Sequence, residues 1–164
     1  MRFQLVDRIL AVQPGRSIQT VKNLTLGEEY LADHFPTFPV MPGVLMLQTL
    51  VEASAWLWRI TDDFRYSLIT LREAKNVKYG HFMEPGRTMT VSAEWVEQTG
   101  DQAVFKGKGE ADGQTTVAAR IVLTRYNLRE RNPALAAVDE QLVQHWRNLY
   151  TLLRGDMQPH AVVG

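Results

Sequence analysis

An almost unbroken apolar run covers residues 43–60 and limits the folds available to this chain. Its length corresponds to about five helical turns, and a helix that is apolar on most sides is normally buried on most sides. The polar exceptions Gln48, Glu52 and Arg59 recur at about the helical period, so they form one narrow stripe. The sequence therefore predicts a helix inside the protein, with this stripe as the candidate chemistry.

A proline-rich loop leads into the predicted helix and carries a histidine. Residues 34–43 read His-Phe-Pro-Thr-Phe-Pro-Val-Met-Pro-Gly. Each proline fixes its own φ and disfavours the α conformation for the residue before it, so the loop cannot join the helix until Pro42. We therefore expect a stiff, extended loop with His34 at its start.

Much of the remaining chain has the apolar and polar alternation of β-strands. Asp112-Gly113 is a strong hairpin signal, and Glu84-Pro85-Gly86 is a tight turn. Residues 3–12 fit either a short helix or a strand. We expect strands at residues 17–26, 66–73, 74–82, 88–97, 103–110 and 115–125. The expected fold class is α+β, with an antiparallel sheet wrapped around the one long apolar helix.

The C-terminal part has a helical rather than an alternating pattern of apolar residues. This pattern predicts an added amphipathic helix of roughly twenty residues. Asn132 is a good N-cap, Pro133 suits the first helical position, and Gly155 is a stop signal. Apolar residues recur at three- and four-residue steps: Leu135, Val138, Leu142, Trp146, Leu149 and Leu153. We therefore divide the chain into a domain at residues 1–128 and a helix with a loose tail at residues 129–164.

The composition excludes several classes of function. Lys+Arg and Asp+Glu both total 18, so there is no net field to attract nucleic acid or an anionic membrane. The lack of cysteine excludes disulfides, thiolate metal sites and cysteine nucleophiles. The N-terminus lacks an apolar signal-peptide core, and we expect a cytoplasmic protein. His81, His145 and His160 have no motif context, and no nucleotide motif is present, so we expect neither a metal nor a cofactor.

The segment from His34 to Glu52 resembles the signature of the bacterial 3-hydroxyacyl-[acyl-carrier-protein] dehydratases of fatty-acid synthesis, which is similar to H-F-x-x-x-P-x-x-P-G-V-L-x-L-[ED]. The matching positions are His34-Phe35, Pro39, Pro42-Gly43-Val44-Leu45 and Leu47. Further similar segments follow the family order: Leu5-Val6-Asp7-Arg8-Ile9, Val21-Lys22-Asn23, Glu84-Pro85-Gly86 and Phe105-Lys106-Gly107. The resemblance covers residues 3–125 and implies the hotdog fold.

This resemblance also implies a reaction and its machinery. A base removes the C2 proton of a 3-hydroxyacyl thioester, and hydroxide leaves C3. His34 resembles the family's base, and the backbone N–H groups at Gly43 and Val44 resemble its oxyanion donors. The implied partners are an acyl thioester on acyl carrier protein or coenzyme A and a second copy of the chain, because each subunit supplies half of a site.

The main departure from the family lies at Gln48, fourteen residues after the histidine, where the family has an Asp or Glu contributed by the partner subunit. Glutamine can orient a hydroxyl by hydrogen bonds, but it cannot deliver a proton. Losing a positioned acid typically costs about 10²–10⁴-fold in rate. Asp33 and Thr37 also replace residues that are commonly glycine in the family.

Glu52 lies one helical turn beyond Gln48 on the same face and leaves three interpretations open. In the first, Glu52 protonates the leaving group. In the second, it activates water to hydrolyse a thioester, as in hotdog thioesterases. In the third, it merely pairs with Arg59, a lysine or backbone groups. We favour the structural pairing. The function hypotheses are accordingly a dehydratase, a module that binds acyl groups without efficient turnover, and a thioesterase.

Four further apolar residues are candidates for lining an acyl tunnel: Phe38, Met41, Met46 and Phe82. The flexible methionine side chain suits a chain-shaped ligand. Ordinary core packing is the alternative for each of the four.

Overall fold

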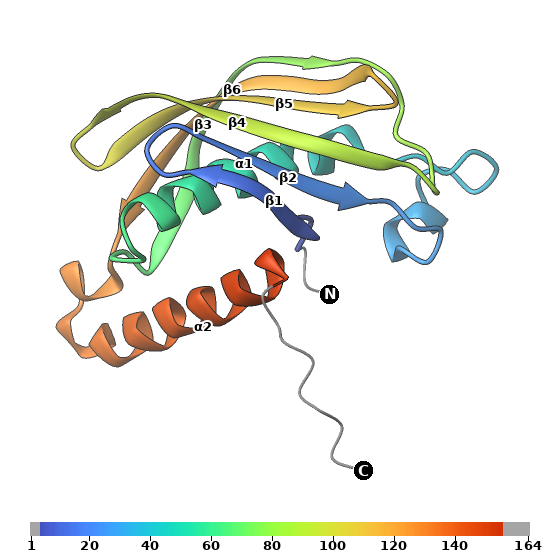
Figure 1. Cartoon of the computed structure of the whole chain (residues 1–164). Helices are drawn as coiled ribbons and strands as arrows, with labels where there is room; N and C mark the ends of the chain where they lie inside the picture. Colours follow the sequence, from blue (N-terminus) through green and yellow to red (C-terminus); the bar gives the residue numbers. More distant parts are fainter. Residues whose placement is uncertain (1–3, 156–164) are drawn as a thin grey trace.

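The computed structural model describes residues 4–155, and its core is one six-stranded antiparallel sheet (Figure 1). The strand order is β1-β2-β4-β5-β6-β3. The strands are β1 (Arg8–Gln13), β2 (Ser17–Asn23), β3 (Leu68–Tyr79), β4 (Thr88–Thr99), β5 (Gln102–Ala111) and β6 (Gln114–Tyr126). Three 3-10 helices span Glu29–Ala32, Leu128–Glu130 and Pro133–Leu135, and two α-helices, α1 (Gly43–Thr61) and α2 (Ala136–Arg154), complete the described elements.

Helix α1 begins at Gly43, directly after the last proline of the loop, as the sequence predicts. The sheet curves over it (Figure 1), and its side chains Leu57 and Trp58 are fully buried. At Gly107 of β5 a Cβ atom would lie 3.1 Å from the Cβ of Leu50, so the glycine lets the helix approach the strand closely. The predicted central helix and antiparallel sheet are therefore both present.

The strands agree with the sequence analysis except in β3 and at the end of β2. One strand, β3 (Leu68–Tyr79), stands where the sequence predicts two strands at residues 66–73 and 74–82, with register shifts between Leu71 and Glu73 and between Lys75 and Lys78. These irregularities disturb the simple alternation on which the prediction rested. The undecided N-terminal segment contains a strand, β1, and β2 ends at Asn23 rather than Leu26.

The Asp112-Gly113 hairpin forms as predicted. Asp112 has φ 51° and Gly113 has φ 76°, so both residues adopt the left-handed conformation that a two-residue hairpin turn requires. The meander of β4, β5 and β6 therefore follows from local signals in the sequence.

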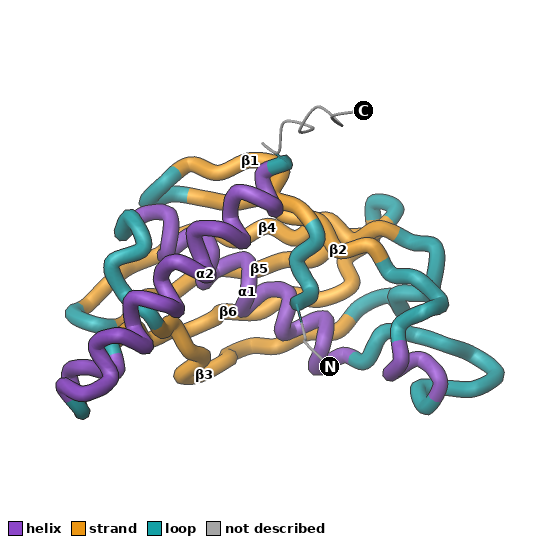
Figure 2. The backbone as a smooth tube through the Cα atoms, turned by 90° about the horizontal axis from the view of Figure 1, so that it is seen from below, coloured by secondary structure: helices purple, strands orange, loops and turns teal. Residues whose placement is uncertain are grey.

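Helix α2 lies across the side of α1 that faces away from the sheet, as the view from below shows (Figure 2). The Asn132 side chain caps the preceding 3-10 turn by accepting from the Ala134 N–H at 3.1 Å, and Gly155 ends the helix with φ 74°. The predicted apolar stripe is only partly correct. Val138 is 38% exposed, whereas the neighbouring Asp139 is fully buried. The predicted loose tail at residues 156–164 lies outside the described residues.

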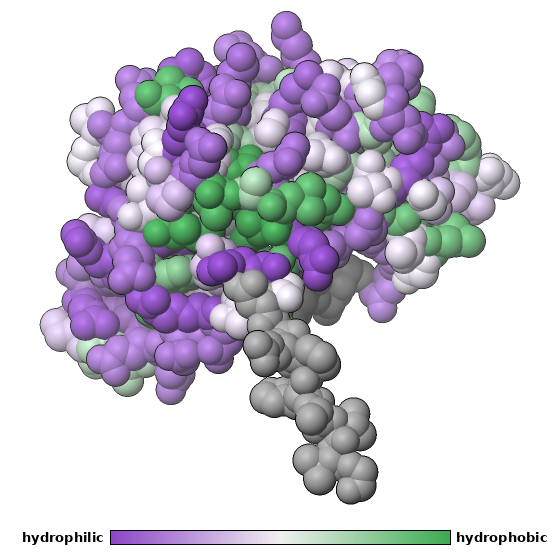
Figure 3. Space-filling view, in the orientation of Figure 1, coloured by the Kyte–Doolittle hydropathy of each residue, from purple (hydrophilic) through white to green (hydrophobic). Residues whose placement is uncertain are grey.

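The molecule therefore has three layers, in the order sheet, α1 and α2 (Figure 1). Figure 3 shows hydrophobic side chains gathered at the β1 edge above α2, while polar side chains cover the outer face of α2. The polar stripe of α1 thus faces the layer that α2 occupies. Among the described residues, no helix has both the length and the apolar character to cross a membrane.

Candidate active site

The loop before α1 holds His34 in a fixed orientation. The imidazole is half-buried, and its Nδ1 atom lies 2.8 Å from the carbonyl oxygen of Val40. The Val40 N–H donates in turn to the carbonyl of His34 at 3.0 Å. A carbonyl oxygen only accepts, so Nδ1 carries the hydrogen and Nε2 is the basic nitrogen of the neutral ring. His34 thus has the tautomer that a base acting through Nε2 requires.

The start of α1 offers two backbone donors. The carbonyl of Pro42 accepts from the N–H groups of Leu45 at 2.9 Å and Met46 at 3.1 Å. The N–H groups of Gly43 and Val44 donate no hydrogen bond within residues 4–155. Donors of this kind at a helix N-terminus attract negative charge. The role of Gly43 and Val44 as donors to an oxyanion stays a prediction.

Gly43 has a packing role as well. A Cβ atom at this position would lie 3.0–3.3 Å from ring atoms of Tyr79, at the end of β3. The Tyr79 ring therefore occupies the side of Gly43 where a side chain would stand, which the sequence alone did not indicate.

The polar stripe of α1 opens onto a cavity of about 330 Å³ between α1, α2 and the start of β3. Gln48, Glu52 and Arg59 all line it, which confirms that they share one face of the helix. The other lining residues are Gln4, Val51, Ala55, Trp56, Leu68, Ile69, His145, Trp146 and Leu149. His34 is not among them, so one subunit does not bring His34 and Gln48 together around this cavity.

Glu52 is bound to the N-terminal segment. Its Oε2 atom accepts hydrogen bonds from the backbone N–H groups of Leu5 at 2.9 Å and Val6 at 3.1 Å. Burial raises the pKa of this carboxyl, although these hydrogen bonds, one from Gln48 and the charge of Arg59 act in the opposite direction. Within the described chain, Glu52 thus joins α1 to the segment before β1, which is a structural role.

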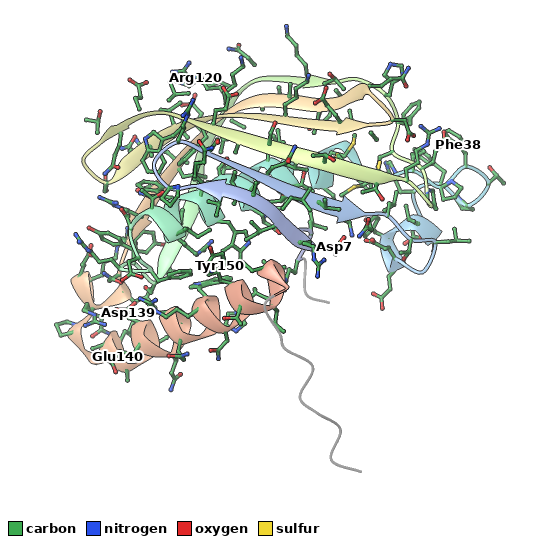
Figure 4. All side chains as sticks on the ribbon, viewed as in Figure 1. Asp7, Phe38, Arg120, Asp139, Glu140 and Tyr150 are labelled. Atoms are coloured by element: carbon green, nitrogen blue, oxygen red, sulfur yellow. The ribbon has the colours of Figure 1, made fainter. Side chains whose placement is uncertain are left out.

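The four residues proposed to line a tunnel fall into two groups. Met41 and Met46 are buried in the hydrophobic core. Phe38 and Phe82 are 48% and 63% exposed, and their rings meet edge to face at 5.8 Å. None of the four lines the cavity above. Figure 4 shows Phe38 at the end of the molecule opposite to Asp139 of α2, and a tunnel through these four residues remains a prediction.

The sequence analysis missed the contribution of α2 to the cavity. His145 and Trp146 line it, and the Arg59 guanidinium carbon lies 4.1 Å from the centre of the Trp146 ring. Trp146 was identified only as part of an apolar stripe, and His145 as a histidine without context. The one sequence signal for this contribution to the cavity was the pair of adjacent aromatic side chains, His145 and Trp146, on the C-terminal helix.

The chain is similar in sequence to known proteins. A family model described as a FabA-like domain matches residues 1–120. The 3-hydroxyacyl-[acyl-carrier-protein] dehydratase FabZ of Janthinobacterium sp. (strain Marseille) is 33% identical over 135 residues, covering 79% of this chain and 85% of the relative. FabZ of Shewanella sediminis is 31% identical over 134 residues, covering 78% and 86%.

A solved structure shares the fold. The dehydratase heterocomplex ApeI:P from Xenorhabdus doucetiae matches with a TM-score of 0.65 and 14% sequence identity, over 82% of this chain and 90% of that one. Together with the arrangement of the sheet around α1, this likeness confirms the predicted hotdog fold.

Proposed function

Because this chain belongs to the FabA-like family of the FabZ dehydratases, we propose that it dehydrates a 3-hydroxyacyl thioester with His34 as the base. The observation that carries the proposal is the Nδ1 contact of His34 with the Val40 carbonyl, which leaves Nε2 as the basic nitrogen. In the reaction, Nε2 takes the C2 proton of the substrate. The C3–O bond then breaks as the C2–C3 double bond forms, and the leaving hydroxide takes a proton from solvent water, so the products are a 2-enoyl thioester and water. The His34 imidazolium returns its proton to solvent.

The start of α1 supplies the second part of the machinery. Negative charge develops on the thioester oxygen as the C2 proton leaves, and the Gly43 and Val44 N–H groups are free to donate to it. Donors that are already oriented need no reorganisation during the reaction. The helix dipole adds to the same effect.

Gln48 takes the position of the family's acid. Its amide can hold the C3 hydroxyl by hydrogen bonds, but it cannot give the leaving group a proton. We therefore expect a slow dehydratase, by about 10²–10⁴-fold relative to an enzyme with a positioned acid. Acyl carrier protein is the proposed carrier, since both relatives are named for substrates on that protein.

A dimer is part of the proposal, because Gln48 is expected to face His34 of a second copy. The strand β3 supports this, since it pairs with β6 on one side only and is one of the two edges of the sheet. Exposed apolar side chains at the histidine loop and beside it support it too: Phe35, Phe38, Val44, Tyr79 and Phe82. Apolar surface of this kind typically marks an interface.

One assay separates the three hypotheses. The protein is incubated with a 3-hydroxyacyl thioester and, separately, with the corresponding 2-enoyl thioester, and the absorbance of the conjugated thioester and the release of free thiol are both recorded. A dehydratase changes the absorbance in opposite directions with the two substrates and releases no thiol. Free thiol indicates hydrolysis, and a protein that binds the substrates without either change is a binding module.

A further inference from the structure

Arg59 is a buried cation that forms no close ion pair within the described residues. Its side chain is 6% exposed, and its Nε atom is buried without a hydrogen-bond partner. None of the ion pairs formed within residues 4–155 includes it. Burial lowers the pKa of Arg59 to about 10, with the charge of Glu52 opposing, so the guanidinium remains charged at neutral pH.

Two tryptophans hold the guanidinium in place. Its central carbon lies 4.1 Å from the ring centre of Trp146 on α2 and 5.5 Å from that of Trp56 on α1. A guanidinium near an aromatic face is attracted by the ring, and its N–H donors, which lie in the guanidinium plane, remain available for other partners. A buried charge that lacks a close ion pair and leaves an N–H donor without an acceptor is costly. The arrangement therefore holds Arg59 ready for an anion.

The cavity beside Arg59 has the size and lining of a ligand site. Its volume of about 330 Å³ is at the lower end of the roughly 300–1,000 Å³ found for small-molecule sites. The walls are mostly apolar: Val51, Ala55, Leu68, Ile69 and Leu149 line it together with the two tryptophans. Helix α2, which supplies Trp146 and Leu149, lies beyond the residues that match the family. The site is thus completed by an element outside the match.

We propose that this cavity binds a small ligand with an apolar body that ends in a carboxylate, and that Arg59 is the anchor for the carboxylate. The planar donors of a guanidinium match the two oxygens of a carboxylate. Arg59 is the one lysine or arginine among the residues that line the cavity, and the acidic Glu52 lines it as well. A single positive charge beside a carboxyl group favours a singly charged carboxylate over a phosphate.

Two sources of this chemistry fit the cavity. One is a free carboxylic acid. The other, which rests on the proposed function, is the far end of the acyl chain of a substrate, because Gln48 also lines the cavity. Gln48 and Arg59 are eleven residues apart on α1, which corresponds to roughly 16 Å along the helix axis.

The test uses the full chain and two probes of equal length, octanoate and the uncharged octanamide. Binding is measured by calorimetry and by tryptophan fluorescence. We expect octanoate to bind at least tenfold more tightly than octanamide, and Arg59→Met to abolish this difference. Leu149→Phe, which fills the cavity from α2, weakens octanoate binding at least tenfold. Leu152→Phe, on the exposed side of the same helix, leaves it unchanged and is the matched control.

A second arm distinguishes the sources by turnover. A 3-hydroxyacyl thioester with a terminal carboxylate is compared with its methyl ester. A higher kcat/KM for the carboxylate that disappears in Arg59→Met assigns the site to the acyl chain, while octanoate binding without such a preference assigns it to a free acid.

The proposal is overturned when octanoate binds no better than octanamide and the thioesters show no preference. It is overturned equally when Arg59→Met folds and leaves both selectivities intact. A protein that binds octanoate selectively but lacks dehydratase activity contradicts only the proposed function.

Discussion

The Nδ1 atom of His34 lies 2.8 Å from the carbonyl oxygen of Val40, within the loop that leads into α1. This contact fixes both the orientation and the tautomer of the imidazole. It also makes the role of His34 testable, because an amide side chain can keep the contact without providing a base.

We expect His34→Asn to lower the dehydration rate by about 10²–10⁴-fold, the usual contribution of a general base. The asparagine NH₂ group is able to donate to Val40 in place of Nδ1, so the melting temperature should change little. The exposed His81 gives the matched control, and His81→Asn should leave the rate unchanged. A His34→Asn protein with near-normal turnover would show that another group removes the proton.

Gln48→Glu should raise the dehydration rate above that of the unmodified protein, because it supplies the missing proton donor. The new carboxyl would stand one turn from Glu52, and two neighbouring carboxyl groups favour keeping one of them protonated. The measurement is kcat with a 3-hydroxyacyl thioester between pH 6 and pH 8. A folded Gln48→Glu protein without any gain would mean that the site has another use.

Mixing two impaired variants tests the shared site. His34→Asn and Gln48→Ala each impair both sites of a homodimer, but a mixed dimer contains one site with both native residues. With random exchange of subunits, the mixture should recover about a quarter of the native rate. Activity is compared with the sum of the two unmixed variants, and sedimentation gives the oligomeric state. No recovery in a mixture that exchanges subunits would place both residues of a site on one chain.

Glu52→Gln separates a structural from a chemical role. Burial raises the pKa of Glu52 above its ordinary value of 4.5, so the folded protein binds the proton more tightly than the unfolded chain. The stability linked to this proton is fully present below the unfolded pKa and is lost as the pH rises through the folded pKa. Glutamine still accepts from the Leu5 and Val6 N–H groups but does not titrate. The free energy of unfolding of Glu52→Gln, measured with denaturant, should therefore not show this fall with rising pH. Any thiol release by the native protein that disappears in this variant would instead support hydrolysis.

Asp139 should be the main attachment point of α2. Its carboxylate accepts hydrogen bonds from the Ser67 hydroxyl and from the backbone N–H groups of Leu128 and Arg129, both at 2.9 Å. Although burial raises its pKa, these hydrogen bonds outweigh that effect and lower the pKa from 3.8 to about 2. Asp139→Ala leaves the buried Ser67 hydroxyl and two partly buried backbone N–H groups without an acceptor, and should cost about 3 kcal/mol of unfolding free energy.

The pH dependence of this attachment follows from the lowered pKa of Asp139. Its contribution to stability is present above the unfolded pKa of 3.8 and is lost as the pH falls toward 2. Figure 4 shows Glu140 pointing away from the body of the protein, and Glu140→Ala is therefore the control, with little effect on unfolding. Equal effects of Asp139→Ala and Glu140→Ala on thermal unfolding would contradict the role of Asp139.

Local sequence was sufficient to predict the features that depend on neighbouring residues. The prolines before Gly43 fix where α1 begins, and Asp112-Gly113 fixes the hairpin between β5 and β6. Asn132 and Gly155 cap the C-terminal helical segment. In each case a short stretch of backbone has only a few permitted conformations, so the local sequence is sufficient.

Which groups meet across the chain could be seen only in the folded protein. Glu52 receives its hydrogen bonds from Leu5 and Val6, 47 and 46 residues away. Trp146 of α2 reaches Arg59 of α1, and this contact turns a polar stripe into the wall of a cavity. The periodicity of a helix tells which residues share a face, but it does not tell what that face will meet. That choice depends on the burial and hydrogen bonding of distant segments together, because each buried polar group must find its partners in the assembled fold.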